Sequence, residues 1–436
     1  MESSDVIHYE TYLFGHRDVT WGPRRNGVLT LTQIFRDDPA TTRPLTGSTL
    51  LADGSLIITS SFEDFSRTIF VVAKLDQRGE VDATFGVDGR VTGTFLPDVD
   101  AYGGPITEDK KHGRLLMAGS TWTATHADPL PAILCLDQAG KKVPDFGNDG
   151  QLIVDCASEQ RYPVDTPTWV CSLSDGSFFV GVNYVRGPSR VRTATLLKFN
   201  EFGKPAGNFG KNGRSEIRLE DDSTATSLSD GCILDDGRIL IAGYAQVDGG
   251  TKKALLAMLN ADGSVHERFG DRQTPGVVLV APEPVDAAFN AVRQRTTNTF
   301  MAAGYSDENT EFLRCGLLMG FDASGSADTG FNAGRLLISN RDEGRIPVNW
   351  EDLVFVDGHI LAAGGNLEGS YIGCINMAGD FEGDFVPTGS GFLDETPIAL
   401  AAPSLHYNAR NRQLVCGVNL NPRSDLGGLY RYQIHY

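Results

Sequence analysis

Residues 234–270 read LDDGRILIAGYAQVDGGTKKALLAMLNADGSVHERFG and hold the elements that decide the fold. The Asp-Gly pair at 236–237 separates two apolar runs, and such a pair favours a hairpin because both residues tolerate positive φ. A further apolar run, 254–259, ends at a second glycine-containing turn. The Phe-Gly pair at 269–270 then opens another run. Together these features predict a unit of four short antiparallel strands.

The same unit recurs along the chain. Counterparts of Phe269 follow one another about 60 residues apart, at Phe85, Phe146, Phe209, Phe331 and Phe385. Residues 18–22 fit the same phrase with Trp21 in place of phenylalanine. Seven units of four strands predict a β-propeller, whose blades typically number four to eight.

The two ends of the chain complement each other. Residues 402–436 supply three strands of a unit, and residues 17–36 begin with the fourth. Pairing these ends would close the ring and remove two exposed sheet edges. We therefore predict an all-β, seven-bladed propeller that forms one domain over residues 1–436. Its blades are expected at 44–96, 104–157, 167–219, 227–282, 288–340, 350–398, and 402–436 with 17–36.

The best copy of the repeat also carries a family resemblance. Its pattern LxDGxILxAG, then LxxLNxDGSxxxxFG, resembles the delta-60 repeat family of bacterial β-propellers. Later units depart from the pattern, since Phe385 lacks the following glycine and the fifth unit lacks the Asp-Gly pair. The resemblance implies the fold and brings no shared catalytic motif with it, and a propeller fold does not by itself imply an activity.

Composition excludes some classes of function. The 436 residues carry a formal net charge of −18, and an acidic chain repels phosphate backbones, which argues against nucleic-acid binding. No apolar run approaches the ~18 residues of a membrane-spanning helix. The start of this chain lacks the pattern of a signal peptide, so we expect a cytoplasmic protein or one exported without a classical leader. We expect it to be a monomer.

The loops indicate where a ligand would bind. The predicted connections between blades are mostly acidic, and they share one face of the ring with the loops between second and third strands. We expect Asp98 and Asp100 on that face to contact a ligand. Tyr102, Trp122 and Trp350 would stack on a sugar or a partner, or else seal the blade interfaces. An acidic rim that only keeps the protein soluble is the alternative interpretation.

The densest acidic run is the candidate metal site. Glu220, Asp221 and Asp222 are consecutive, and carboxylate oxygens are the usual ligands of Ca²⁺. We expect no obligatory cofactor, and Ca²⁺ is the ion that this run would bind.

The motif search yields no known catalytic signature, such as GxSxG, HExxH or a phosphate-binding loop. The leading hypothesis is a non-enzymatic binding scaffold that recognises a protein or carbohydrate partner through its acidic loop face. One alternative is a metal-assisted hydrolase or lyase with a carboxylate-bound cation on the axis and His126 as base. Another is a bacterial secreted effector or toxin component.

Overall fold

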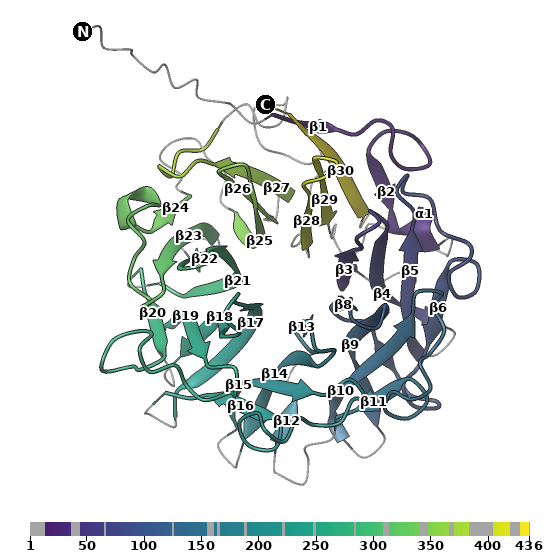
Figure 1. Cartoon of the computed structure of the whole chain (residues 1–436), viewed down its shortest axis with the longest axis horizontal. Coiled ribbons are helices and arrows are strands. Elements are labelled where there is room, and N and C mark those ends of the chain that lie inside the picture. Colours follow the sequence, from purple (N-terminus) through teal and green to yellow (C-terminus); the bar gives the residue numbers. More distant parts are fainter. Residues whose placement is uncertain are drawn as a thin grey trace, which may run out of the picture.

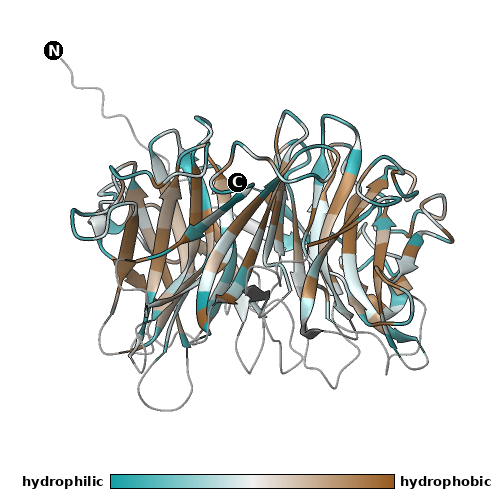
Figure 2. Ribbon diagram, turned by 90° about the horizontal axis from the view of Figure 1, so that it is seen from below, coloured by the Kyte–Doolittle hydropathy of each residue, from teal (hydrophilic) through white to brown (hydrophobic). Residues whose placement is uncertain are grey.

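Each repeat of the sequence forms one antiparallel β-sheet, and seven such sheets stand around a central axis in the computed structural model (Figure 1). Figure 2 shows that the strands are largely apolar and that the described loops at their ends are mostly hydrophilic. The predicted all-β, seven-bladed propeller is confirmed. The structure describes residues 14–35, 44–64, 67–123, 126–154, 161–163, 166–186, 190–219, 223–246, 250–282, 285–307, 314–339, 348–365, 370–382, 404–418 and 428–435.

The first four blades follow one another along the chain. The first consists of β3 (Gly47–Leu50), β4 (Leu56–Asp64), β5 (Arg67–Leu75) and β6 (Arg90–Gly93). The second consists of β7 (Ala101–Tyr102), β8 (Ile106–Asp109), β9 (Arg114–Thr123), β10 (His126–Asp137) and β11 (Gln151–Ile153). The third consists of β12 (Arg161–Pro163), β13 (Trp169–Ser172), β14 (Phe178–Arg186), β15 (Val191–Phe199) and β16 (Arg214–Ile217). The fourth consists of β17 (Ala225–Ile233), β18 (Ile239–Gln246), β19 (Lys252–Leu259) and β20 (Val277–Val280).

The remaining blades complete the ring. The fifth consists of β21 (Ala287–Thr296), β22 (Thr299–Asp307), β23 (Arg314–Asp322) and β24 (Leu337–Ile338), with a short 3-10 turn η2 (Asn332–Gly334) before β24. The described part of the sixth consists of β25 (Asn349–Val356), β26 (His359–Gly365) and β27 (Ser370–Ile375). The seventh joins β28 (Ser404–Asn408), β29 (Gln413–Val418) and β30 (Gly428–His435) to β1 (Phe14–Arg17) and β2 (Val28–Thr30). Phe385 lies outside the described residues.

The Phe-Gly phrase links each blade to the next. The N–H of the residue after the aromatic donates to a carbonyl in the turn after the third strand of the following blade, at 2.7 to 3.0 Å. The pairs are Gly22 to Arg78, Gly86 to Ala139, Gly147 to Phe202, Gly210 to Asp262, Gly270 to Ser324 and Asn332 to Met377. All six donors have positive φ, which explains why glycine, and once asparagine, occupies the position.

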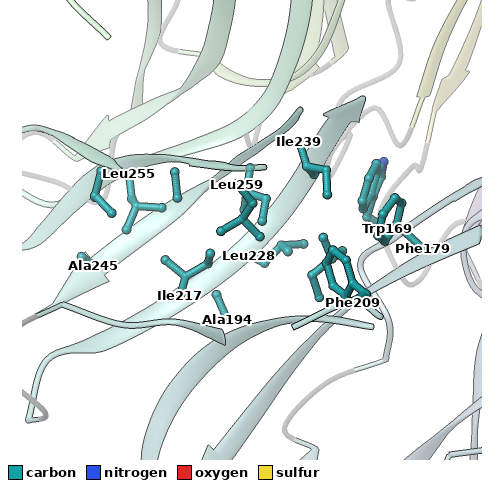
Figure 3. Packing of buried hydrophobic residues seen from close by; sticks show 14 residues of the cluster. Trp169, Phe179, Ala194, Phe209, Ile217, Leu228, Ile239, Ala245, Leu255 and Leu259 are labelled. Carbon is teal, nitrogen blue, oxygen red and sulfur yellow. The ribbon is translucent and has the colours of Figure 1, made fainter. Parts of the chain in front are cut away.

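The hydrophobic core lies between the blades. The described residues form seven buried clusters, and each cluster joins two adjacent blades. Figure 3 shows the cluster between the third and fourth blades, where Phe209 packs beside Trp169 and Phe179 and faces Leu228 and Ile239. The aromatic of the repeat phrase is therefore buried at a blade interface, which is the physical reason for its recurrence.

The two ends of the chain close the ring as predicted. β1 and β2 both pair antiparallel with β30, and β1 lies beside β30 in Figure 1. Asp18 and Arg431 form a buried ion pair at 2.9 Å, and Trp21 lies under the Arg431 guanidinium. The fourth strand expected within residues 17–36 is short. It contains only β2, and the helix α1 (Leu31–Phe35) follows, with the Thr30 hydroxyl accepting from the Gln33 N–H at its start.

Candidate functional site

Four of the five predicted ligand-binding residues lie together at the junction of the first and second blades. Asp98 and Asp100 belong to the connection between the blades, and Tyr102 follows in β7. β7 pairs with β9, and the Trp122 N–H at the end of β9 donates to the Asp100 carbonyl at 3.0 Å. We call these four residues the loop corner.

Asp100 has a structural role in the loop corner. Its carboxylate accepts from the Thr68 N–H at 2.6 Å, which ties the connection to β5. Its carbonyl also accepts from the Thr121 hydroxyl. Asp286 does the same between the fourth and fifth blades, where its carboxylate accepts from the Lys252 N–H at 2.7 Å. Asp100 therefore fixes the backbone that presents its neighbours.

A ligand at the loop corner could contact an exposed ion pair and two aromatic side chains. The Asp98 side chain is 94% exposed and pairs with Arg67 at 3.1 Å, a contact that solvent weakens. Tyr102 and Trp122 are half-buried. Rigid aromatic rings beside an exposed ion pair are suited to contact a sugar ring or a peptide, because each ring buries much apolar area at low entropic cost.

Trp350 lies elsewhere. It is only 3% exposed, in the innermost strand of the sixth blade, where its ring is stacked on Phe381. A Cβ on Gly316 would lie 2.2 Å from its indole nitrogen, so the ring fills the space between blades. This position corresponds to the alternative of an aromatic that seals a blade interface.

The structure says little about the predicted metal ligands and the predicted base His126. Glu220, Asp221 and Asp222 lie outside the described residues. His126 begins β10, opposite Thr123, but the structure does not describe its side chain. Within the described residues no group of three or more His, Cys, Asp or Glu side chains is placed to hold a metal ion, so the calcium site stays a prediction.

The sequence analysis missed a polar layer around the axis. Arg293 in β21 reaches Asp230 in β17 on one side and Asp352 in β25 on the other, the latter at 2.5 Å. The second Asp352 oxygen accepts from the Leu405 N–H in β28. Burial alone would lower the pKa of Arg293, but the two carboxylates outweigh it and raise that pKa. One guanidinium thus joins the innermost strands of four blades.

Two further ionisable groups lie in the same innermost strands. Burial raises the pKa of Glu351 to about 7, opposed by the Arg314 charge and reinforced by the Asp352 charge. The Glu351 carboxylate accepts from the Asn349 amide. Burial and the Arg293 charge lower the pKa of His406 to about 4. His406 lies 2.8 Å from the Ser48 hydroxyl of the first blade, so it is a neutral contact across the ring closure.

A signal for this layer is present in the sequence. Asp230, Arg293 and Asp352 recur about 60 residues apart, one in each of three successive units. β-bulges interrupt the strands beside Asp230 and Asp352. A bulge breaks the alternation that marks a strand, so the direction of these two side chains could not be predicted from the sequence.

Fold and site together define a β-propeller with an exposed loop corner and a polar layer around its axis. A family model described as "Domain of unknown function (DUF5122) beta-propeller" matches residues 234–266. No curated protein matches the chain. This supports a β-propeller family without extending the match to the other units.

Solved structures resemble most of the chain. The polysaccharide lyase Uly1 is 10% identical over 89% of each chain, with a TM-score of 0.50. An α-L-arabinofuranosidase from Fusarium graminearum is 12% identical over 97% of this chain and 98% of its own, with a TM-score of 0.47. A periplasmic gluconolactonase from Pseudomonas aeruginosa is 11% identical over 77% and 83%, with a TM-score of 0.46. At these identities the likeness shows the fold alone.

The sequence predicts that no segment of the chain spans a membrane. Among the described residues no helix has the length and apolar character needed to cross a bilayer.

Proposed function

We propose that this protein is a non-enzymatic binding scaffold that recognises a protein or glycan partner through the loop face of the ring. The observation that carries the proposal is the loop corner, where Trp122, Tyr102 and Asp98 are accessible on a backbone held by Asp100. Preorganised aromatic groups beside a charge are a common basis for recognition.

The axial layer supports a scaffold more than a catalyst. Arg293 stands between Asp230 and Asp352 and pairs with both carboxylates. A cation bound there would have to displace a guanidinium that makes charge-assisted bonds on both sides. The layer therefore stabilises the ring that presents the loop corner.

The test compares wild-type protein with Trp122→Ala. Both proteins are labelled and applied to a glycan array and to an array of extracellular and intracellular protein domains. We expect ligands of the wild type to bind W122A at least about tenfold more weakly, a loss of 1.4 kcal/mol or more. Asp98→Asn should weaken the same ligands by a smaller factor.

A matched control is Val87→Ala. Val87 is 78% exposed in the turn before β6, whereas the loop corner lies beyond the other end of that strand. V87A should bind like wild type. Ligands that bind W122A and wild type equally, or an array without any ligand, would overturn the proposed role of the loop corner.

One observation keeps a hydrolase or lyase as the second candidate function. A carboxylic acid with a pKa of about 7 is suited to proton transfer at neutral pH, and burial gives this property to Glu351. This candidate requires turnover of a substrate that depends on Glu351. Loss of turnover in Glu351→Gln with unchanged ligand binding would favour it over the scaffold.

A further inference from the structure

A groove of about 920 Å³ runs beside β11, the outer strand of the second blade. One wall comes from residues 95–96, which follow the first blade, and the other from the turn 202–205 of the third blade. The Gln151 amide donates to the Thr94 carbonyl at 3.1 Å and holds the first wall in place. The apolar lining consists of Phe95, Leu96, Leu152, Ile153, Phe202 and Pro205.

Phe202 is not explained by the repeat. Its turn recurs in six blades, and its position in the turn is otherwise occupied by small or polar residues: Arg78, Ala139, Asp262, Ser324 and Ala378. The hydrogen bond that links the second and third blades at this turn uses only the Phe202 carbonyl, which accepts from the Gly147 N–H. The ring is nevertheless 47% exposed, so folding gains little from an aromatic side chain at this turn.

The strand beside the groove has an open edge. The backbone N–H and carbonyl groups that face β10 belong to Gly150, Leu152 and Val154. Because these groups alternate along a strand, the N–H and carbonyl of Ile153 point away from β10. The Ile153 N–H and carbonyl have no backbone partner among the described residues. An unpaired edge of this kind is a template for a further strand.

Two exposed side chains of opposite charge lie on the groove. Asp145 belongs to the turn that leads into β11, and Lys204 belongs to the turn with Phe202. Both side chains are exposed, and neither makes an ion pair within the described part of the chain. An occupant with a basic group for Asp145 and an acidic group for Lys204 would complement them.

We propose that this groove binds an extended peptide segment of a partner protein, which adds to the edge of β11. Ile153 would supply the main-chain hydrogen bonds, and the rings of Phe202 and Pro205 would hold alternate apolar side chains of the peptide. Asp145 and Lys204 would favour a peptide with a basic residue on one side and an acidic residue on the other. This inference concerns a second surface and does not depend on the loop corner.

The experiment selects ligands from a library of random linear peptides displayed on phage, with the immobilised full chain as bait. Enriched peptides are synthesised with a fluorescent label, and their dissociation constants are measured by anisotropy. The key variant is Phe202→Ala, which introduces the residue that the second blade carries at Ala139. We expect at least about tenfold weaker binding to F202A, as for a central aromatic contact.

Three further measurements make the result decisive. Arg78→Ala changes the same turn position in the first blade and should leave binding unchanged. A peptide N-methylated at the residue facing Ile153 should bind at least about tenfold more weakly, because it loses a strand hydrogen bond. Trp122→Ala should bind the peptides normally, which separates this groove from the loop corner.

Two outcomes would overturn the proposal. One is a selection without enrichment, or peptides that bind F202A as tightly as wild type. The other is a concentration-dependent dimer in sedimentation velocity that F202A abolishes, because the occupant of the groove would then be a second copy of this chain.

Discussion

At the scale of the residue, backbone conformation explains the most recurrent feature of the sequence. The glycine after the repeat aromatic adopts positive φ and donates to the next blade. At Gly86 a Cβ would lie 2.0 Å from the Arg90 carbonyl oxygen. Asn332 occupies the equivalent position with φ of 45°, consistent with the tolerance of asparagine for this region.

Gly86→Ala should therefore destabilise the ring by about 2 kcal/mol or more, since it adds strain and a backbone clash at one link between blades. The measurement is urea unfolding followed by circular dichroism. Gly207→Ala is the control, because a Cβ there meets nothing within 4 Å and φ is not positive. Equal midpoints for the two variants would contradict the link.

His406 predicts a dependence of stability on pH. Burial and the Arg293 charge lower the pKa of His406 to about 4 in the folded protein, against about 6.5 in an unfolded chain. The neutral form is favoured by folding, so its contribution to stability is complete above about pH 6.5 and is lost as the pH falls toward 4.

The check is urea unfolding of wild type and His406→Gln between neutral pH and about pH 4. Glutamine keeps a hydrogen-bonding group near Ser48 and does not titrate, so the decrease in unfolding free energy should be smaller in H406Q. His435→Gln serves as control, because His435 is exposed. An identical pH profile for wild type and H406Q would refute the assignment.

At the scale of the element, the innermost strands are joined by Arg293. Arg293→Met would leave Asp230 and Asp352 in the polar layer without their partner. Because the Arg293 side chain is 32% exposed, we expect a loss of about 1.5–3 kcal/mol, as for hydrogen bonds to charged groups, and not the larger cost of breaking a fully buried pair. Arg67→Met breaks the exposed pair with Asp98 and should cost below about 1 kcal/mol. The measurement is thermal unfolding of both variants. Similar losses of stability in R293M and R67M would contradict the expectation and mean that solvent screens the Arg293 pairs as well.

Ring closure is the second property at this scale. β30 receives β1 and β2 from the start of the chain, and their removal would expose its edge. Deletion of residues 1–36 should lower the unfolding midpoint and cause aggregation, because an unpaired edge is a template for other chains. Size-exclusion chromatography with thermal unfolding is the measurement. A soluble, equally stable truncation would contradict closure by these strands.

At the scale of the whole molecule, metal dependence separates the two candidate functions. A scaffold predicts an unchanged melting temperature when EDTA is followed by excess Ca²⁺, Mg²⁺, Mn²⁺ or Zn²⁺. A metal at about 100 times its dissociation constant would instead add about 2.7 kcal/mol to stability. If that gain disappears in the double variant Asp221→Asn with Asp222→Asn, the acidic run binds the ion and the hydrolase becomes the better hypothesis.

The sequence by itself determined the architecture of this protein. Repeated Asp-Gly turns, apolar runs and the Phe-Gly phrase are local signals, since each acts through the conformation and burial of a few neighbouring residues. They were enough to predict seven blades and the closure of the ring through Trp21. The loop corner was also within reach, because Asp98, Asp100 and Tyr102 are neighbours in the chain.

Only the tertiary structure decided how the polar groups are used. Trp350 appeared to lie near a ligand face, yet the register of β25 buries it at a blade interface. Asp230 and Asp352 are far apart in the sequence, yet both pair with Arg293 from separate blades. Phe202 faces a groove formed by three successive blades. Such contacts depend on how blades pack around an axis, and local patterns contain no information on distance across that axis.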